Sequence, residues 1–451
     1  MSETYWLERA WLGPGEASTA DGVATRVLVT IEGGRFAEVT PGVAEPPSGA
    51  HRLEGLTIPG MANCHSHAFH RALRGRTQRE RGTFWTWREQ MYALAGRLTP
   101  DTYFDLAKAA FREMVAAGFT AVGEFHYLHH GPGGTPYDDP NAMGQAVVDA
   151  AREAGLRITL LDTCYVTSRI GAPAEGVQLR FSDGDAEGWA ARVERLETLR
   201  DDDVLIGAAV HSVRAVPREQ VAQVADWVTA HRVPLHVHLS EQVAENEACL
   251  EAYGMTPTEL LDDAGALGSL TTAVHATHLT VLDVERLGGT GTHACFCPTT
   301  ERDLGDGIGP SRQLYAAGAR LTLGTDSHAV VDPFEEMRAV ELDERLATQE
   351  RGHWSAEELL TAATVTGHRS LGFEEGGRIA VGAPADLVTL GLRSPRTAGT
   401  GGAAESAVFA AGAADVTQVV AGGRVVATAE DRAEIGCELD SVISRLWEEV
   451  R

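Results

Sequence analysis

The chain has 451 residues, of which 43% are hydrophobic, and its formal net charge is −26 at pH 7. This length and composition predict a globular protein with a sizeable core, and the negative charge argues against nucleic acid or an anionic membrane as a partner. Six cysteines lie scattered without a CxxC pair, and no run of uncharged apolar residues is long enough for a membrane span. We therefore expect a cytoplasmic enzyme with reduced thiols that acts on a small molecule.

The two ends of the chain carry short β-type runs that are broken by glycine and proline. Such runs predict strands and hairpins, and we expect both ends, residues 1–58 and 371–451, to build one small β-sandwich domain. Residues 393–414 contain few large apolar side chains and predict a loop. From about Glu438 onward, apolar residues recur at helical spacing and predict a terminal helix.

Between these ends the chain repeats a pattern of strand, loop and helix. The strand candidates are residues 57–67, 120–127, 157–166, 204–211, 234–240, 272–278, 291–297 and 320–325. Amphipathic patterns such as residues 102–117 and 218–230 separate them. Eight such units in residues 59–370 predict an α/β fold with a TIM-type (β/α)8 barrel, and an open doubly wound sheet is the alternative.

Histidine and acidic residues gather in or just after four of the predicted strands. They are His65 and His67 in the first, His236, His238 and Glu241 in the fifth, His275 and His278 in the sixth, and Asp326 and His328 in the eighth. Alone, each histidine is typical of a buried core residue and the aspartate of a turn or cap. The carboxyl ends of barrel strands meet at one rim, so together they indicate a divalent-metal site in a hydrolase.

The motifs HSH at 65–67, HVHLSE at 236–241, VHATH at 274–278 and GTDS at 324–327 resemble those of the amidohydrolase superfamily, in its deaminase branch. The resemblance implies one Zn²⁺ per chain, held by His65, His67, His238 and Asp326; iron or manganese suits similar ligands. The single lysine, Lys108, lies in a helical pattern, which argues against the two-metal version that a carboxylated lysine bridges.

The resemblance also implies how this rim would hydrolyse a C–N bond. Asp326 would take a proton from the attacking water, and His275 would orient that water and stabilise the developing charge. Glu241 would deliver a proton to the leaving nitrogen.

Residues 84–88, 124–130 and 211–215 resemble the formimidoylglutamate deiminases, which hydrolyse N-formimino-L-glutamate to N-formyl-L-glutamate and ammonia in histidine degradation. This substrate carries two carboxylates, which Arg88, Arg214 and His211 would bind, with Tyr127 as a hydroxyl donor. His70 stands where we expect a glutamine in that family, and it is a further candidate for substrate binding. We expect a homodimer.

Two other functions remain open from the sequence. A deaminase of a nucleobase or an adenosyl derivative would share the metal ligands, but its site would need groups that read the edge of a ring. A non-catalytic barrel that serves as a scaffold would be expected to have lost metal ligands, and this sequence retains all of them.

Overall fold

The computed structural model describes residues 3–13, 22–78, 82 and 84–448. Its centre is an eight-stranded parallel sheet in the order β14-β13-β12-β11-β10-β7-β6-β5. The strands are β5 (Met61–Ser66), β6 (Phe119–His126), β7 (Arg157–Cys164), β10 (Val204–Val210), β11 (Leu235–Leu239), β12 (Thr271–His275), β13 (His293–Phe296) and β14 (Arg320–Leu323). The amide N–H groups of Thr325 and Asp326 donate to the carbonyl of His65, and Ser66 bridges Asp326. The first and last strands therefore meet, which makes the sheet a closed barrel and excludes the open doubly wound alternative.

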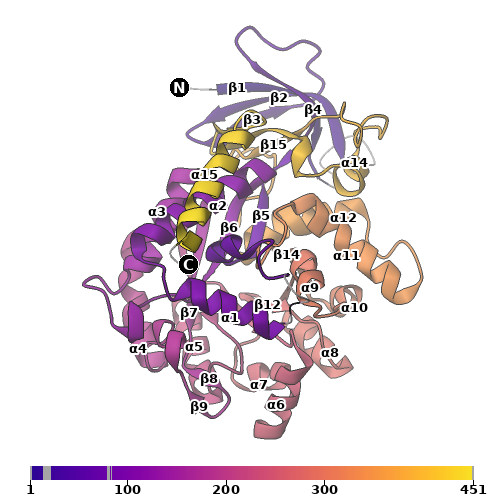
Figure 1. The fold of residues 1–451 in the computed structure, drawn as a ribbon. Helices are drawn as coiled ribbons and strands as arrows, with labels where there is room; N and C mark the ends of the chain where they lie inside the picture. The colour runs from indigo at the N-terminus through magenta and orange to yellow at the C-terminus, as the bar shows by residue number, and fades with distance from the viewer. Residues whose placement is uncertain (1–2, 14–21, 79–81, 83, 449–451) are drawn as a thin grey trace.

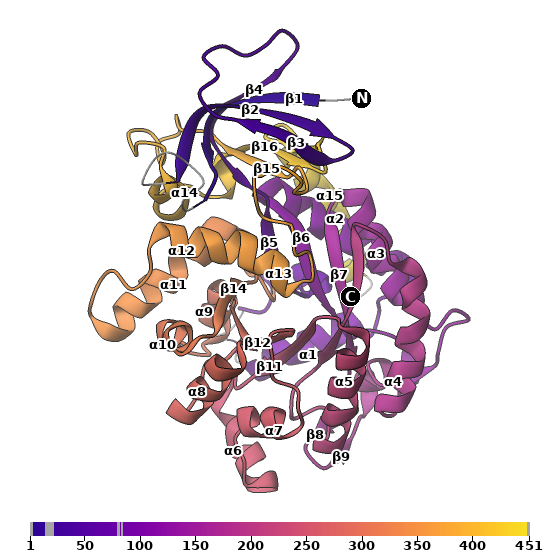
Figure 2. The same cartoon turned by 180° about the vertical axis from the view of Figure 1, so that it is seen from behind.

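Helices surround the barrel on its outer face, except that α1 lies over the rim that holds the pocket (Figures 1 and 2). They are α1 (Phe84–Ala95), α2 (Pro100–Ala117), α3 (Ala142–Ala154), α4 (Ala186–Val193), α5 (Arg218–His231), α6 (Val243–Tyr253), α7 (Pro257–Asp263), α8 (Val281–Thr290), α9 (Pro298–Leu304), α10 (Ser311–Ala317), α11 (Pro333–Thr348), α12 (Ala356–Thr361) and α13 (Gly367–Ser370). Both amphipathic patterns singled out in the sequence are confirmed as helices, α2 and α5. α2 begins at Pro100, two residues before the predicted start, and Thr99 caps it with a capping box.

Both ends of the chain contribute to a second, mixed sheet of seven strands, in the order β17-β16-β15-β4-β1-β2-β3. The strands are β1 (Glu3–Trp11), β2 (Val23–Glu32), β3 (Arg35–Thr40), β4 (His51–Pro59), β15 (Leu387–Leu390), β16 (Val416–Ala421) and β17 (Arg424–Thr428). β4 pairs with β1 on one side and with β15 on the other. The predicted small β domain from both ends of the chain is therefore confirmed, and it lies above the barrel in Figure 1.

The first predicted barrel strand, residues 57–67, is wrong as a single strand. β4 ends at Pro59 in the small domain and β5 begins at Met61 in the barrel. A Cβ on Gly60 would lie 2.1 Å from Oγ1 of Thr120, so the chain passes between the two sheets at a residue without a side chain. Strand-type residues on both sides of Gly60 obscure the break in the sequence. The other seven predicted strands are confirmed, with ends that differ by a few residues.

Two predictions near the C-terminus are corrected. The predicted loop at 393–414 contains a short helix, α14 (Ala404–Phe409), whose buried face is made of small residues and Val408. The terminal helix α15 (Arg432–Glu448) begins before Glu438. The sequence did not predict this start because the first turns carry a single buried apolar residue, Ile435, so the helical pattern is weak there. This helix lies along α2 (Figure 1), where Glu438 pairs with Arg112. In the part of the chain that the structure describes, no helix combines the length and the apolar character that a membrane crossing needs.

Candidate active site

Four of the predicted side chains meet at the carboxyl-terminal rim of the barrel. Nε2 of His238 lies 3.1 Å from Nε2 of His65 and 3.4 Å from Nε2 of His67. Oδ1 of Asp326 lies 3.3 Å from Nε2 of both His65 and His67. Ligands at about 2.0–2.1 Å from a tetrahedral zinc ion are spaced about 3.3 Å apart, so these atoms have the spacing of such a ligand set.

Hydrogen bonds behind two of these histidines, His67 and His238, turn their Nε2 lone pairs toward the cluster. Nδ1 of His67 donates to the carbonyl of Phe125 at 3.0 Å, and Nδ1 of His238 donates to the carbonyl of His211 at 2.9 Å. A carbonyl oxygen only accepts, so in the neutral rings Nε2 carries no proton and is available to a metal. Burial, with a smaller effect of neighbouring histidines, lowers the pKa of His65, His67 and His238 well below the usual range. The rings are thereby kept in the neutral form that binds metals.

His275 and Glu241 lie beside this cluster. Nε2 of His275 is 3.7 Å from Oδ2 of Asp326 and 3.9 Å from Oε1 of Glu241, and its Nδ1 is 3.2 Å from Oε1 of Glu301. Burial opposes protonation of His275, but the carboxylates of Glu241, Glu301 and Asp326 outweigh it and raise its pKa well above the usual range. Burial also raises the pKa of Glu241. The arrangement thus favours the charged form of the imidazole and the protonated form of the Glu241 carboxyl.

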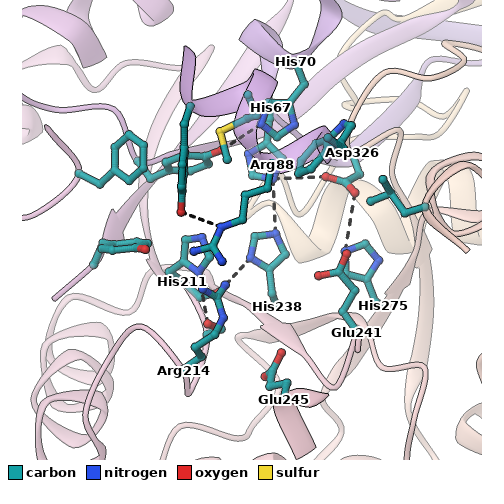
Figure 3. Close-up of a pocket in the computed structure, with 18 residues that line it drawn as sticks. His67, His70, Arg88, His211, Arg214, His238, Glu241, Glu245, His275 and Asp326 are labelled. Carbon is teal, nitrogen blue, oxygen red and sulfur yellow. Dashed lines mark hydrogen bonds and ion pairs between the residues drawn. The ribbon is translucent and has the colours of Figure 1, made fainter. Parts of the chain in front are cut away.

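The rim opens into a pocket of about 670 Å³, its open mouth included. The predicted substrate-binding residues His70, Arg88, Tyr127, His211 and Arg214 all line it. In Figure 3 both arginines lie with His211 on one side of His238, while His275 and Glu241 lie on the other. The pocket therefore has a cationic wall, formed by Arg88 and Arg214, and the candidate proton donors His275 and Glu241 lie on its other side.

One hydrogen bond links two of these residues, and two of them carry a buried nitrogen without a partner. Nε2 of His70 lies 2.9 Å from the hydroxyl of Tyr127, and Nδ1 of His70 is buried without a hydrogen bond among the described residues. Nη1 of Arg214 is likewise buried with no hydrogen-bond partner in the described part of the chain. A buried charged donor left without an acceptor is costly, which favours an anionic ligand beside Arg214.

The other histidines singled out at the strand ends do not join the cluster. Nε2 of His236 lies 3.4 Å from the carbonyl of Ser370, and Nε2 of His278 lies 2.8 Å from the carbonyl of Asp306. Nε2 of His328 lies 3.0 Å from the hydroxyl of Ser66. Each of these side chains contacts a neighbouring segment instead.

Sequence reasoning missed several acidic residues around the site. Glu301 on α9 contacts His275, and Glu245 on α6 lines the pocket. Glu124 on β6 accepts from the Ser66 hydroxyl and from the amide of Ala68, both at 2.6 Å, on either side of His67. Their position after or within a barrel strand was the available signal, but acidic residues are common at such places.

The rim also holds strained backbone. Positive φ angles occur at Ser240 (51°), His275 (68°), Ala276 (48°), Asp326 (41°) and His328 (57°). Residues with side chains seldom adopt this left-handed conformation, and where they do the surrounding structure must hold it. Two residues of the candidate site, His275 and Asp326, are held in this conformation.

Comparisons with known proteins agree on the family of this architecture. A model of the amidohydrolase family matches residues 56–426. The chain is 36% identical to formimidoylglutamate deiminase from Pseudomonas aeruginosa, over 93% of this chain and 94% of that protein. It is 30% identical to 5-methylthioadenosine/S-adenosylhomocysteine deaminase from Syntrophobacter fumaroxidans, over 97% and 90% of the two chains. The crystal structure of an amidohydrolase from Brucella melitensis matches with a TM-score of 0.88 at 31% identity, over 98% and 99% of the two chains.

Proposed function

The chain belongs to the amidohydrolase family, and we propose that it hydrolyses N-formimino-L-glutamate to N-formyl-L-glutamate and ammonia with one zinc ion per chain. The single observation that carries the proposal is the buried, unpartnered Nη1 of Arg214 on a pocket wall that also bears Arg88. A substrate with two carboxylates gives such a wall its acceptors. The 36% identity to a formimidoylglutamate deiminase supports the same substrate.

The proposal assigns His65, His67, His238 and Asp326 as the metal ligands. Their donor atoms have tetrahedral spacing, and Nε2 of His67 and His238 carries no proton in the neutral rings. When bound there, a divalent ion lowers the pKa of a water molecule and so supplies a nucleophile at neutral pH. Imidazole and carboxylate suit zinc, and iron or manganese accept a similar set.

The chain's own residues then move the protons. Asp326 accepts a proton from the attacking water, and its Oδ2 lies 3.7 Å from Nε2 of His275. His275, held protonated by the carboxylates around it, donates a hydrogen bond to the charge that develops as water adds to the amidine carbon. Glu241 gives a proton to the terminal nitrogen. As the bond from carbon to that nitrogen breaks, the hydroxyl on carbon becomes the carbonyl and returns its proton to Glu241. Ammonia takes up the proton held by Asp326 and leaves as ammonium, with the formyl product behind.

Substrate binding is assigned to the opposite wall. Arg88 and Arg214 bind the two carboxylates, since a guanidinium can hold a carboxylate through two parallel hydrogen bonds. His211, Tyr127 and His70 line the same pocket and supply further polar contacts. The proposal also places the reaction in histidine degradation, in the cytoplasm and in a homodimer.

A second candidate is a deaminase of a nucleobase or an adenosyl derivative. Aromatic rings of Trp87, Tyr92, Tyr165 and Phe181 line the pocket, and such rings can stack on a heterocycle. The 30% identity to an adenosyl-type deaminase is in keeping with this reading.

Ammonia release from N-formimino-L-glutamate by zinc-loaded protein tests the two candidates, beside a panel of nucleobases and 5′-modified adenosines. We expect turnover of N-formimino-L-glutamate alone, and a fall in kcat/KM of at least about 100-fold in Arg214→Ala because a charge-assisted pair is lost. Arg218→Ala is the matched control, since Arg218 is partly exposed on α5 and pairs with Asp263. Turnover of the panel without turnover of N-formimino-L-glutamate would overturn the substrate assignment.

A further inference from the structure

A buried glutamine connects two tyrosines of the pocket wall. Gln178 lies on the short 3-10 helix Gly176–Arg180, and its Nε2 donates to the hydroxyl of Tyr92 at 2.9 Å and to that of Tyr165 at 3.0 Å. Its Oε1 accepts from the backbone N–H of Glu175 at 3.2 Å. Because a backbone N–H can only donate, the orientation of the amide is set and both Nε2 protons face the tyrosines.

This arrangement dictates where the tyrosine protons go. The Tyr92 oxygen accepts from Gln178 and also from Nε of Arg88, at 2.8 Å. A hydroxyl oxygen accepts about two hydrogen bonds, so Tyr92 must donate its own proton, either to Tyr165 or into the pocket. If it donates to Tyr165, the Tyr165 oxygen accepts two hydrogen bonds in turn, and the proton of the Tyr165 hydroxyl still needs an acceptor. In either case one O–H remains for an acceptor in the pocket, which both rings line.

The surroundings suit an anionic acceptor. Burial raises the pKa of Tyr165 to about 12, against the opposing charges of Arg214 and Arg88. Tyr165 is therefore a neutral donor at pH 7. The ring of Tyr165 lies 4.8 Å from that of His211, whose carbonyl accepts from the proposed metal ligand His238. His211 therefore lies between Tyr165 and the proposed metal ligands, and both tyrosines belong to the pocket wall that carries Arg88 and Arg214.

We propose that Gln178 is a positioning residue for one carboxylate of the substrate: it holds the hydroxyls of Tyr92 and Tyr165 as donors beside Arg88. The identity of the substrate rests on the proposed function, but the carboxylate subsite itself does not depend on turnover. Gln178 acts through the two tyrosines and Arg88, so its loss affects binding of the anion more than the chemical step.

Glutarate, a dicarboxylate without a reactive group, tests the subsite directly. We expect calorimetry on zinc-loaded protein to show Kd raised about 5- to 10-fold in Gln178→Met, which keeps the length of the side chain but removes the donors. Tyr165→Phe should act in the same direction, because it removes one hydroxyl and leaves the ring. Gln145→Met is the matched control, since Gln145 lies on α3 and bonds Asp149; its Kd should equal that of the wild type.

An unchanged glutarate Kd in folded Gln178→Met overturns the proposal, as does a wild type that does not bind glutarate. If Gln178→Met fails to fold by thermal unfolding, the Kd of Tyr165→Phe decides in its place. With N-formimino-L-glutamate we expect the KM of Gln178→Met to rise about 5- to 10-fold while kcat stays within about twofold; a purely structural defect would lower the active fraction and therefore the apparent kcat. Glutarate binding without turnover by the wild type would sink the proposed function and leave the subsite standing.

Discussion

Two histidines of one strand show how position decides the role of a residue. His236 and His238 both belong to β11 and are two residues apart, so their side chains point to the same face. Nε2 of His238 meets His65 and His67 at the rim, whereas His236 faces the carbonyl of Ser370. The sequence presents them as equivalent, and their depth along the strand separates them.

Zinc content after dialysis against metal-free buffer tests this difference. We expect His238→Asn to lower zinc affinity by more than about 100-fold, because it removes a direct ligand, while even the loss of an outer contact costs 10- to 100-fold. His236→Asn is the matched control on the same strand and should retain about one zinc per chain. Full zinc occupancy in His238→Asn would contradict the assignment of ligands.

Chelation of zinc from the wild type should abolish ammonia release, and added zinc should restore it.

A second histidine–aspartate group shows how neighbouring elements exclude a metal. His126, His129 and Asp162 place possible ligand atoms close together. Both carboxylate oxygens of Asp162, however, accept from Arg192 on α4, at 2.7 and 2.8 Å. A cation would meet this guanidinium, so the group is better explained as a buried ionic network that fixes α4 against β7. Asp183 extends it, with oxygens 2.8 and 2.9 Å from Arg192.

The acid side of the stability profile tests this network. Although burial acts in the opposite direction, Arg192 and neighbouring histidines lower the pKa of Asp162 and Asp183 in the folded protein. Unfolded aspartates titrate near about pH 4, so this stabilisation is complete above that pH and is lost as the pH falls toward the lower folded pKa. In urea unfolding we expect Asp183→Asn to cost about 3 kcal/mol at pH 7.

The difference between wild type and Asp183→Asn should shrink below about pH 4. A difference that stays constant from pH 7 to pH 3 would show that the charge of Asp183 does not contribute. Asp185→Asn offers a comparison on the same segment, because Asp185 caps the start of α4 by accepting from the amide of Gly188 and makes no contact with Arg192 in the described structure.

At the scale of the whole molecule, one buried ion pair joins the two sheets. Arg157 on β7 of the barrel pairs with Asp386, which precedes β15 of the small domain. The other carboxylate oxygen of Asp386 accepts from the amide of Gly422 at 2.8 Å, and its carbonyl accepts from the amide of Gly60 at 3.2 Å. Asp386 therefore fixes the place where the chain passes from one sheet to the other, at the end of the barrel opposite the pocket.

Replacing Asp386 should separate stability from activity. We expect Asp386→Ala to lower the free energy of unfolding by about 3 kcal/mol, because it leaves a buried arginine with less compensation, while KM stays unchanged. Asp203→Ala is a matched control, since Asp203 binds the same arginine at 2.9 Å but is more than half exposed; an exposed pair contributes about 0–1 kcal/mol. Urea unfolding and ammonia release measure the two effects. Equal costs for both variants would contradict the role of Asp386.

Much of the fold could be predicted from local pattern. Buried parallel strands read as short apolar runs between amphipathic helices, and seven of the eight barrel strands follow from that signal. The break at Gly60 was not predicted because the residues on both sides of it, in β4 and β5, are buried and equally typical of strands. The helix α14 escaped because small residues form its buried face, and the early start of α15 because its first turns are mostly polar.

The candidate site divides in the same way. The sequence by itself determined which strand ends carry histidine and aspartate, because strand direction in a barrel sends the residues after each strand to one rim. Only the tertiary structure decided that the nitrogens of His65, His67 and His238 meet Asp326 at tetrahedral spacing, and that Gln178 reaches Tyr92 and Tyr165. These contacts join residues more than seventy positions apart in most cases, and local periodicity contains no information about such distances. These contacts form only when the barrel closes and when α1 and residues 176–180 pack over its rim.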